Sequence, residues 1–301
     1  MRIGYPCINW SVGCKGDRTF RLKSYSEERL IDTVRSNLAC LCSMLRYNAA
    51  HDMLFFRITS DLVPFASHSV CRFDWVARFA SSFSDAGAYT RDHGIRISMH
   101  PDQFVLLNSP SEEVTARSIA ELAYHVDVLD AMGLGADAKI QIHVGGAYGD
   151  RARSVKRFID RFQRLDDRIR RRLVVENDDR LFGLTDCLAI SADTGVPVVF
   201  DWFHHQILSS GQPLPEALGL AASTWAPEDG APIVDYSSQL PHSRPGSHAE
   251  SIDMADFDEF LAKSHPHDFD LMLEIKDKEV SALKAVAKAR SDARFIPGES
   301  G

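Results

Sequence analysis

The chain has 301 residues, of which 45% are apolar and 25% are charged, so a sizeable core is available and an intrinsically disordered chain is excluded. No run approaches the roughly 18 uncharged apolar residues of a membrane helix, and the start MRIGYPCINW lacks the features of a signal peptide. The formal net charge of −8 argues against a general nucleic-acid coat protein, but it allows an enzyme whose carboxylates are neutralised by bound cations.

Short apolar runs alternate along the chain with longer amphipathic stretches, which is typical of parallel strands buried on both faces and joined by helices. The predicted strands are Arg2–Tyr5, Met53–Ile58, Ile95–Met99, Lys139–His143, Leu173–Glu176, Val196–Asp201, Pro232–Tyr236 and Asp270–Ile275. The predicted helices are Ser26–Ala50, Asp74–His93, Ser111–Met132, Asp150–Arg171, Leu184–Thr194, Leu214–Ala222, Met254–Ser264 and Lys278–Ala289.

Residues at the helix ends support these bounds. Ser26 and Ser111 are each followed by two glutamates, as expected of N-caps with an acidic first turn. Gly94, Gly133 and Gly195 each follow a helix, where a left-handed C-cap residue is expected.

Strand and helix alternate eight times, which predicts an α/β fold that consists of a single (β/α)8 TIM barrel. The chain shows no internal repeat, low-complexity segment or linker that would divide it. We therefore predict one domain over residues 1–295 and a flexible tail over residues 296–301.

The six cysteines form no CxxC pair. Cys40 and Cys42 lie two positions apart, so on a helix they point in different directions. Reduced thiols in a cytosolic protein are the preferred interpretation, ahead of a zinc ribbon or a disulfide framework.

Metal-ligand residue types gather at the positions where a barrel carries its chemistry, the C-terminal ends of the strands. These positions hold Tyr5, His100, His143, Glu176, Asp201, Asp235 and Glu274, so that six of the eight strands end in His, Asp or Glu. His204 lies on the loop after Asp201, and His248 lies in the loop after the seventh strand.

Carboxylates and imidazoles that converge on one pocket would repel one another or stay undersatisfied without cations between them. Mixed His, Asp and Glu sets suit Mn²⁺, Zn²⁺ or Fe²⁺. The number of candidate ligands exceeds what one ion needs, which favours two or three ions with bridging carboxylates. A lone strand-end histidine is more often a hydrogen-bonded surface residue, and it is the shared position across strands that favours a metal site. His125, in mid-helix, is expected to be structural.

Motifs spread from the first strand to the last resemble the UV damage endonuclease family. They are Arg2–Tyr5 with Asn9, Arg57–Phe65, Met99–Phe104, Ile142–Gly146, Glu176–Asp178, Phe200–His205, Asp235–Gln239 and Glu274–Glu279. Each motif alone is modest, but the ordered set covers nearly the whole chain and is highly specific.

The resemblance implies a barrel similar to endonuclease IV that holds a cluster of divalent ions, with Mn²⁺ expected and Zn²⁺ or Mg²⁺ as alternatives. It implies hydrolysis of damaged double-stranded DNA immediately 5′ of UV photoproducts, by a protein that acts at the nucleoid of a bacterial-type cytoplasm. One duplex-wide groove is compatible with a monomer, and no membrane contact is expected.

The resemblance also implies a distribution of ligands. His100, His143 and Glu176 would hold one ion, Glu176, Asp201, Glu274 and Asp235 a second, and His204 and His248 would help to hold a third. Glu176 would bridge ions, while Glu274 and Asp201 would position the ion that activates water. Ile233 stands where the family often has a lysine that joins the metal site. Because Ile233 cannot bind an ion, the presence of a third ion stays open.

Lesion recognition is expected from a second set of residues. Gln103 and Phe104 fall at the family's Gln–aromatic pair, which probes the duplex and fills the gap left by an extruded dinucleotide. Tyr5, Asn9 and His68 fall at further lesion-contact positions. Basic side chains over residues 15–23 and 151–157 are candidates for phosphate contacts, although the second run could equally be a solvated helix face.

Two alternatives remain open at this point. A sugar isomerase or other small-molecule metalloenzyme uses the same residue types on the same barrel. A non-catalytic lesion-binding protein would bind damaged duplex without cutting it, an outcome that Ile233 makes more plausible.

Overall fold

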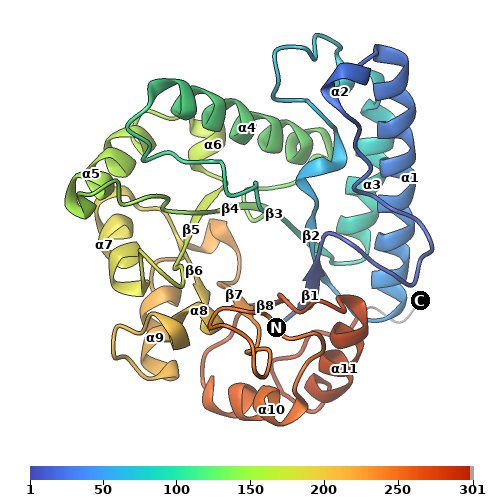
Figure 1. The fold of residues 1–301 in the computed structure, drawn as a ribbon. Coiled ribbons are helices and arrows are strands. Elements are labelled where there is room, and N and C mark those ends of the chain that lie inside the picture. Colours follow the sequence, from blue (N-terminus) through green and yellow to red (C-terminus); the bar gives the residue numbers. More distant parts are fainter. Residues whose placement is uncertain (299–301) are drawn as a thin grey trace.

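The computed structural model describes residues 1–298 and confirms the predicted barrel. Eight parallel strands follow one another around a closed ring, and β8 pairs with β1 to complete it. The strands are β1 (Ile3–Pro6), β2 (Phe55–Ile58), β3 (Arg96–Met99), β4 (Lys139–His143), β5 (Leu173–Glu176), β6 (Val198–Asp201), β7 (Ile233–Tyr236) and β8 (Asp270–Leu273). Figure 1 shows the strands at the centre and the helices around them.

The outer ring contains eleven α-helices within the described residues. They are α1 (Glu27–Ala50), α2 (Trp75–Arg78), α3 (Ala80–Asp92), α4 (Glu112–Ala131), α5 (Arg151–Phe162), α6 (Asp167–Arg170), α7 (Leu184–Thr194), α8 (Trp202–Ile207), α9 (Leu214–Ala222), α10 (Met254–Lys263) and α11 (Glu279–Ala289). The predicted caps are confirmed: Ser26 and Ser111 accept hydrogen bonds from the first turns of α1 and α4. Gly94, Gly133 and Gly195 have positive φ angles.

Three predicted segments differ from the structure. The helix predicted over residues 74–93 is broken at Phe79, whose backbone leaves the helical region. The helix predicted over 150–171 is also two helices, because Asp166 caps a new start at α6. The segment after Asp201, predicted as a loop, is the short helix α8, and His204 therefore lies in its first turn.

The inside of the barrel has an apolar layer. Phe55, Val174, Val199, Ile233 and Met272 form one buried cluster, with Trp225 packed against it. Burying a side chain such as that of Ile233 contributes roughly 1.5–3 kcal/mol to folding. Ile233, at the position where the resemblance implies a lysine, is therefore a core residue here.

A polar layer lies above the apolar one, since side chains two positions apart on a strand share a face. Two residues beyond the five strand residues of the apolar layer stand Arg57, Glu176, Asp201, Asp235 and Glu274. The change from apolar to ionisable side chains thus occurs on five strands, within one residue of the end of each strand. This register places the candidate ligands at one mouth of the barrel.

A disulfide joins Cys14, in the loop after β1, to Cys40 on α1, which corrects the expectation of six reduced thiols. The loop crosses the face of α1 that carries Cys40, so the two Cα atoms come within 5.8 Å, a distance that a disulfide spans. Cys42 points elsewhere on the helix and is free, like Cys7, Cys71 and Cys187.

The first part of the predicted tail lies against the barrel. The N–H of Ile296 donates to the carbonyl of Met1 at 3.0 Å, and the N–H of Gly298 donates to Asp52 at 2.9 Å. Residues 299–301, the rest of that tail, lie outside the described residues. Between Met1 and Gly298, none of the helices combines the length and the apolar character that crossing a membrane requires.

Candidate metal centre

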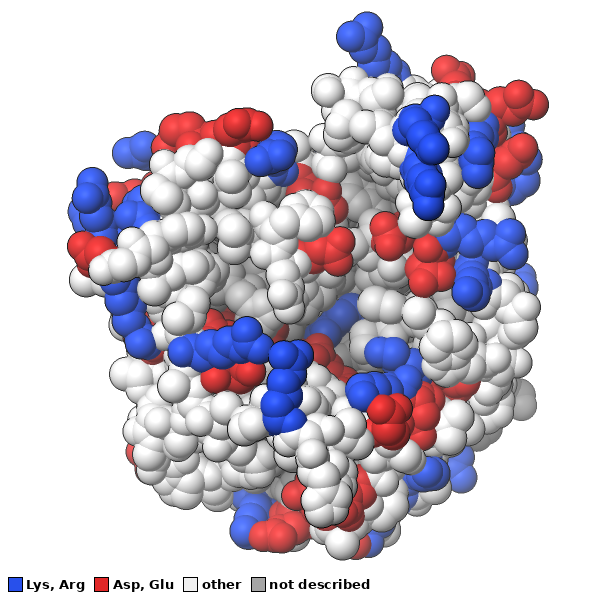
Figure 2. Space-filling model, viewed as in Figure 1, with Lys and Arg blue, Asp and Glu red and all other residues white. Residues whose placement is uncertain are grey.

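A pocket of about 820 Å³ opens at the C-terminal mouth of the barrel. Figure 2 shows it as the hollow near the centre of the face, with lysine and arginine side chains along its lower rim. The candidate ligands that line it are His100, His143, Glu176, His204, His248 and Glu274. Asp201 and Asp235 lie beneath its floor and are fully buried.

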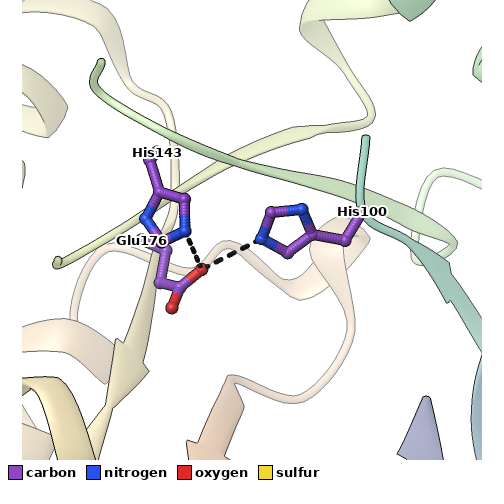
Figure 3. Close-up of side chains that lie close together, drawn as sticks. All are labelled: His100, His143 and Glu176. Atoms are coloured by element: carbon purple, nitrogen blue, oxygen red, sulfur yellow. Dashed lines mark hydrogen bonds and ion pairs between the residues drawn. The ribbon is translucent and has the colours of Figure 1, made fainter. Parts of the chain in front are cut away.

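Glu176 is the centre of the ligand cluster. Its Oε2 atom lies 3.3 Å from Nε2 of His100 and 3.6 Å from Nε2 of His143, as Figure 3 shows. Its Oε1 atom lies 3.1 Å from Nδ1 of His204. Burial alone would raise the pKa of Glu176, but these three histidines outweigh it and hold that pKa well below its usual value. Glu176 is thus an ionised carboxylate whose two oxygens face different imidazoles.

Asp201 ends β6 and begins α8. Its Oδ1 accepts the backbone N–H of His204 at 2.7 Å, while its buried Oδ2 has no hydrogen-bond donor among the described residues and lies 3.4 Å from Nδ1 of His204. Burial raises the pKa of Asp201 well above its usual value, and nearby carboxylates add to the effect. Burial lowers the pKa of His204, but Asp201 and Glu176 outweigh it and raise that pKa to about 11. Both shifts indicate that negative charge exceeds positive charge around Asp201 and His204.

Three imidazoles are oriented by backbone carbonyl groups. The Nδ1 atoms of His100, His204 and His248 lie 2.8, 3.0 and 2.7 Å from the carbonyl oxygens of Pro101, Asn177 and Glu274. A histidine that donates its Nδ1–H to a carbonyl presents a bare Nε2, which is the usual arrangement of a metal-binding imidazole, and this applies to His100 and His248. In His204 it is Nδ1 that also faces the carboxylates, 3.1 Å from Glu176 and 3.4 Å from Asp201.

Asn177, which directly follows β5, links that strand to Asp201 at the end of β6. Its side chain donates to the carbonyl of Asp201 and accepts the N–H of the same residue, both at 2.9 Å. Sequence reasoning placed Asn177 only within a family motif. The two bonds fix Asp201 relative to Glu176, the residue before Asn177.

Arg57 and Gln141 were missed as site residues. The Nη2 of Arg57 donates to Asp235 at 2.9 Å and to Oε1 of Gln141 at 2.8 Å, and its Nη1 bonds to Glu274. Gln141 in turn donates to Asp235 and to Glu176, both at 2.6 Å. For Arg57 the available signal was a charged side chain inside the otherwise apolar strand β2. For Gln141 it was a polar side chain two positions before His143, and therefore on the same face of β4.

These contacts decide the charge states of two further carboxyl groups. Burial raises the pKa of Asp235 to about 7, although Arg57 opposes the shift. Burial would also raise the pKa of Glu274, but Arg57 outweighs it and holds that pKa at about 2. Arg57 therefore supplies positive charge from inside the barrel.

The described residues include three groups of side chains that could hold a metal ion. They are His100–His143–Glu176, Glu176–Asp201–His204 and Asp201–Asp235–Glu274, and within each group the ligand atoms lie within 4.8 Å of one another. Glu176 and Asp201 each belong to two groups, as bridging ligands would. The bare Oδ2 of Asp201 and the mixed nitrogen and oxygen donors fit divalent cations. His248 lines the pocket but belongs to none of the three groups.

The predicted lesion-contact residues divide into three classes. Gln103 lines the pocket, and Phe104 beside it is 55% exposed, which is unusual for a phenylalanine. Tyr5 and Asn9 are buried, and the phenol accepts a hydrogen bond from Asn9 and donates one to Asn48. These two residues are positioned to hold the loop after β1, and the structure does not bring them to the surface. His68 is exposed but does not line the pocket.

The basic side chains also divide. Arg180, Arg244, Lys276 and Lys278 line the pocket itself. The run on α5 is largely engaged within the protein, where Arg151 pairs with Asp186 and Lys156 pairs with Asp160. Lys15, Arg18, Arg21 and Lys23 are exposed on the loop before α1. The solvated-face interpretation thus suits α5 better than the phosphate interpretation.

Comparisons with known proteins agree with this geometry. The family described as UV-endonuclease UvdE matches residues 1–295. A UV DNA damage endonuclease of Bacillus cereus is 35% identical over 97% of this chain and 95% of its own length. One of Clostridium perfringens is 35% identical over 95% of this chain and 70% of its own length.

Solved structures show the same relationship. The crystal structure of SacUVDE is 46% identical, covers 98% of this chain and 100% of its own, and has a TM-score of 0.93. Endonuclease IV of Thermus thermophilus and a 3-keto-D-glucoside 4-epimerase of E. coli share only the barrel, with TM-scores of 0.56 and 0.57 at 16% and 13% identity. The match over nearly the whole length shows that this chain belongs to the UV-endonuclease family.

Proposed function

We propose that this protein is a metal-dependent DNA repair endonuclease that hydrolyses damaged duplex DNA immediately 5′ of UV photoproducts. Family membership supports an endonuclease that acts on damaged DNA. The observation that carries the metal dependence is Glu176, a buried ionised carboxylate that three imidazoles surround at the floor of an open pocket.

Divalent ions would be held by the groups built on Glu176 and Asp201, with Mn²⁺ expected and Zn²⁺ or Mg²⁺ as alternatives. When bound, such ions activate water and stabilise the leaving oxygen of a phosphodiester. The chain itself orients the ligands: backbone carbonyls turn three imidazoles, Asn177 fixes Asp201, and Gln141 fixes Glu176.

The pocket rim supplies the contacts that a DNA backbone needs. Arg180, Arg244, Lys276 and Lys278 lie around the same opening as the ligand cluster. Arg180 pairs with Asp179 and Lys276 pairs with Glu250, whereas Arg244 and Lys278 form no ion pair within residues 1–298 and can each neutralise a phosphate. This local positive charge can offset the net charge of −8. This rim favours a polyanionic substrate over a neutral sugar.

Lesion selection would use Gln103 and Phe104. A photodimer weakens stacking and pairing, so extruding it costs less than extruding normal bases. An exposed aromatic ring can stack in the gap that remains, and an amide can hydrogen-bond the orphaned bases. Phe104 is exposed and directly follows Gln103, which lines the pocket, so its ring is free to stack on a base.

Incubation with ultraviolet-irradiated supercoiled plasmid and Mn²⁺ tests the proposal. We expect conversion to nicked circles that stops with EDTA and is absent with unirradiated plasmid. An end-labelled duplex with one defined photodimer should yield a cut at the phosphodiester directly 5′ of the dimer.

The matched control is Glu176→Gln, which keeps the shape but removes the central charge. It should abolish nicking and leave the circular dichroism spectrum unchanged. Metal-dependent nicking retained by this variant would contradict the role of Glu176. Tight binding to irradiated duplex without any cut by the unmodified protein would instead identify a non-catalytic lesion binder.

A further inference from the structure

Arg57 projects from β2 to the floor of the pocket and contacts the third candidate ligand group, Asp201–Asp235–Glu274. Its Nη2 lies 3.0 Å from Oδ1 and 2.9 Å from Oδ2 of Asp235, and its Nη1 bonds to Glu274. Arg57 is only 2% exposed. The guanidinium thus spans two of the three carboxylates that could hold an ion there.

Gln141 occupies a further bonding position of Asp235. Its Nε2 donates to Oδ2 of Asp235 at 2.6 Å, and its Oε1 accepts from Arg57 at 2.8 Å. Oδ2 of Asp235 therefore has two donors, and Oδ1 has one. An ion that used these oxygens would have to displace bonds from a fixed cation.

A guanidinium cannot give up its proton to make room for a metal ion, because it stays charged at any ordinary pH. A divalent ion bound to Asp235 and Glu274 would lie beside that charge and be repelled by it. Arg57 is almost fully buried at the pocket floor, where its bonds to Asp235, Glu274 and Gln141 hold it in place. The guanidinium of Arg57 and a divalent ion would therefore compete for the same carboxylate oxygens of Asp235 and Glu274.

The other two ligand groups differ in this respect. Within the described residues, no lysine or arginine forms an ion pair with Glu176 or Asp201, whose partners are histidines. At β7 the position that could have supplied an extra ligand holds Ile233, which packs in the apolar layer. Ile233 lies two positions before Asp235 on β7, so this strand adds no further ligand to the group that Arg57 contacts.

We propose that Arg57 takes the place of a metal ion at the Asp201–Asp235–Glu274 group, so that the centre holds two divalent ions, at the groups built on Glu176. This inference rests on the metal dependence in the proposed function. Arg57 is a positioning residue in this view: it balances the charge of Asp235 and Glu274 and sets the number of ions.

Metal counting tests the inference without reference to activity. The purified protein and its variants are stripped with EDTA, loaded with Mn²⁺, desalted, and assayed for manganese per chain by plasma mass spectrometry, with calorimetric titration as a second count. We expect two ions in the unmodified protein, two in Arg57→Lys, which keeps the charge, and three in Arg57→Met, which removes it. Three ions in the unmodified protein, or two in Arg57→Met, would overturn the inference.

Asp235→Asn provides a second test if Arg57→Met does not fold. This change removes a ligand of the third group only. The inference predicts that the count stays at two, whereas a fall by one relative to the unmodified protein would refute it. The plasmid assay separates the two proposals: nicking that needs Mn²⁺ with a count of three defeats only the inference, and a count of zero defeats the metal dependence itself.

Discussion

Asp201 caps the helix that carries His204. The backbone N–H of His204 donates to Oδ1 of Asp201 at 2.7 Å, and Nδ1 of the same histidine lies 3.4 Å from Oδ2. The two oxygens of the Asp201 carboxyl group therefore have different roles, helix capping for Oδ1 and a candidate metal ligand for Oδ2. Oδ1 caps the first turn of α8, and Oδ2 lies beneath the pocket floor without a hydrogen-bond donor among residues 1–298.

Asp201→Asn should separate these tasks. An amide oxygen can still cap α8, since Asn and Asp are comparable N-caps. The amide lacks the charge that a divalent ion needs, so we expect nicking activity to fall at least about 100-fold with little change in melting temperature. The control is Asp201→Ala, which loses the cap as well and should cost about 1 kcal/mol of stability. If Asp201→Asn keeps its activity, Asp201 is only a cap.

Phe104→Ala should weaken binding to damaged duplex. Loss of stacking on one base costs about 1–3 kcal/mol, which corresponds to roughly 5- to 150-fold in Kd. Phe104 is 55% exposed, so the melting temperature and the Mn²⁺ affinity should stay the same. Fluorescence anisotropy with a photodimer-containing duplex and a matched undamaged duplex measures the difference. An equal loss of metal and DNA binding would show that Phe104 supports the pocket and does not probe DNA.

Arg244→Gln should reduce the salt dependence of DNA binding. Arg244 lines the pocket and makes no salt bridge with any residue between 1 and 298. Removal of one phosphate contact lowers the slope of log Kd against log salt concentration by about 1, for damaged and undamaged duplex alike. Lys156→Gln on α5 is the matched control, because Lys156 is paired with Asp160 and should not change the slope. Equal slopes for both variants would place the DNA elsewhere.

Much of the ligand cluster could be predicted because the direction of side chains along a parallel strand follows a simple rule. Side chains alternate between two faces, and in a barrel the strand ends meet at one mouth. His143, Glu176 and Asp201 are the last residues of their strands, and His100 and Glu274 follow theirs directly. Errors of one or two residues in the bounds do not move these side chains to another part of the fold.

The features that could not be predicted from the sequence depend on contacts between distant segments or on a single cap. Arg57 is one charged residue within an apolar run, and only the closed barrel shows that it meets Asp235. The disulfide joins cysteines 26 positions apart, which no spacing rule connects. Helix α8 has only six residues, several of them aromatic or histidine with weak helix propensity, so its start depends on the Asp201 cap.

His125 should make the metal-free protein less stable at low pH. It is fully buried on α4, where its Nδ1 lies 2.7 Å from the carbonyl of Glu121, and burial lowers its pKa to about 4. The unfolded chain, with a histidine pKa near 6.5, binds the proton more readily. The contribution of neutral His125 to the free energy of unfolding is therefore fully present above about pH 6.5. It is lost as the pH falls towards 4, and the loss is about 2 kcal/mol at pH 5.

Urea unfolding in EDTA at pH 7 and pH 5 measures this loss, with His125→Gln for comparison. The glutamine variant should be less stable at pH 7, because packing around the ring is lost, but its stability should fall by about 2 kcal/mol less between the two pH values. The carboxyl groups that titrate in the same range are common to both proteins, so they cancel in the difference. An identical pH dependence in the two proteins would mean that His125 takes up a proton as readily in the folded state as in the unfolded chain, with Ser60, 3.1 Å from its Nε2, accepting the hydrogen bond of the protonated ring.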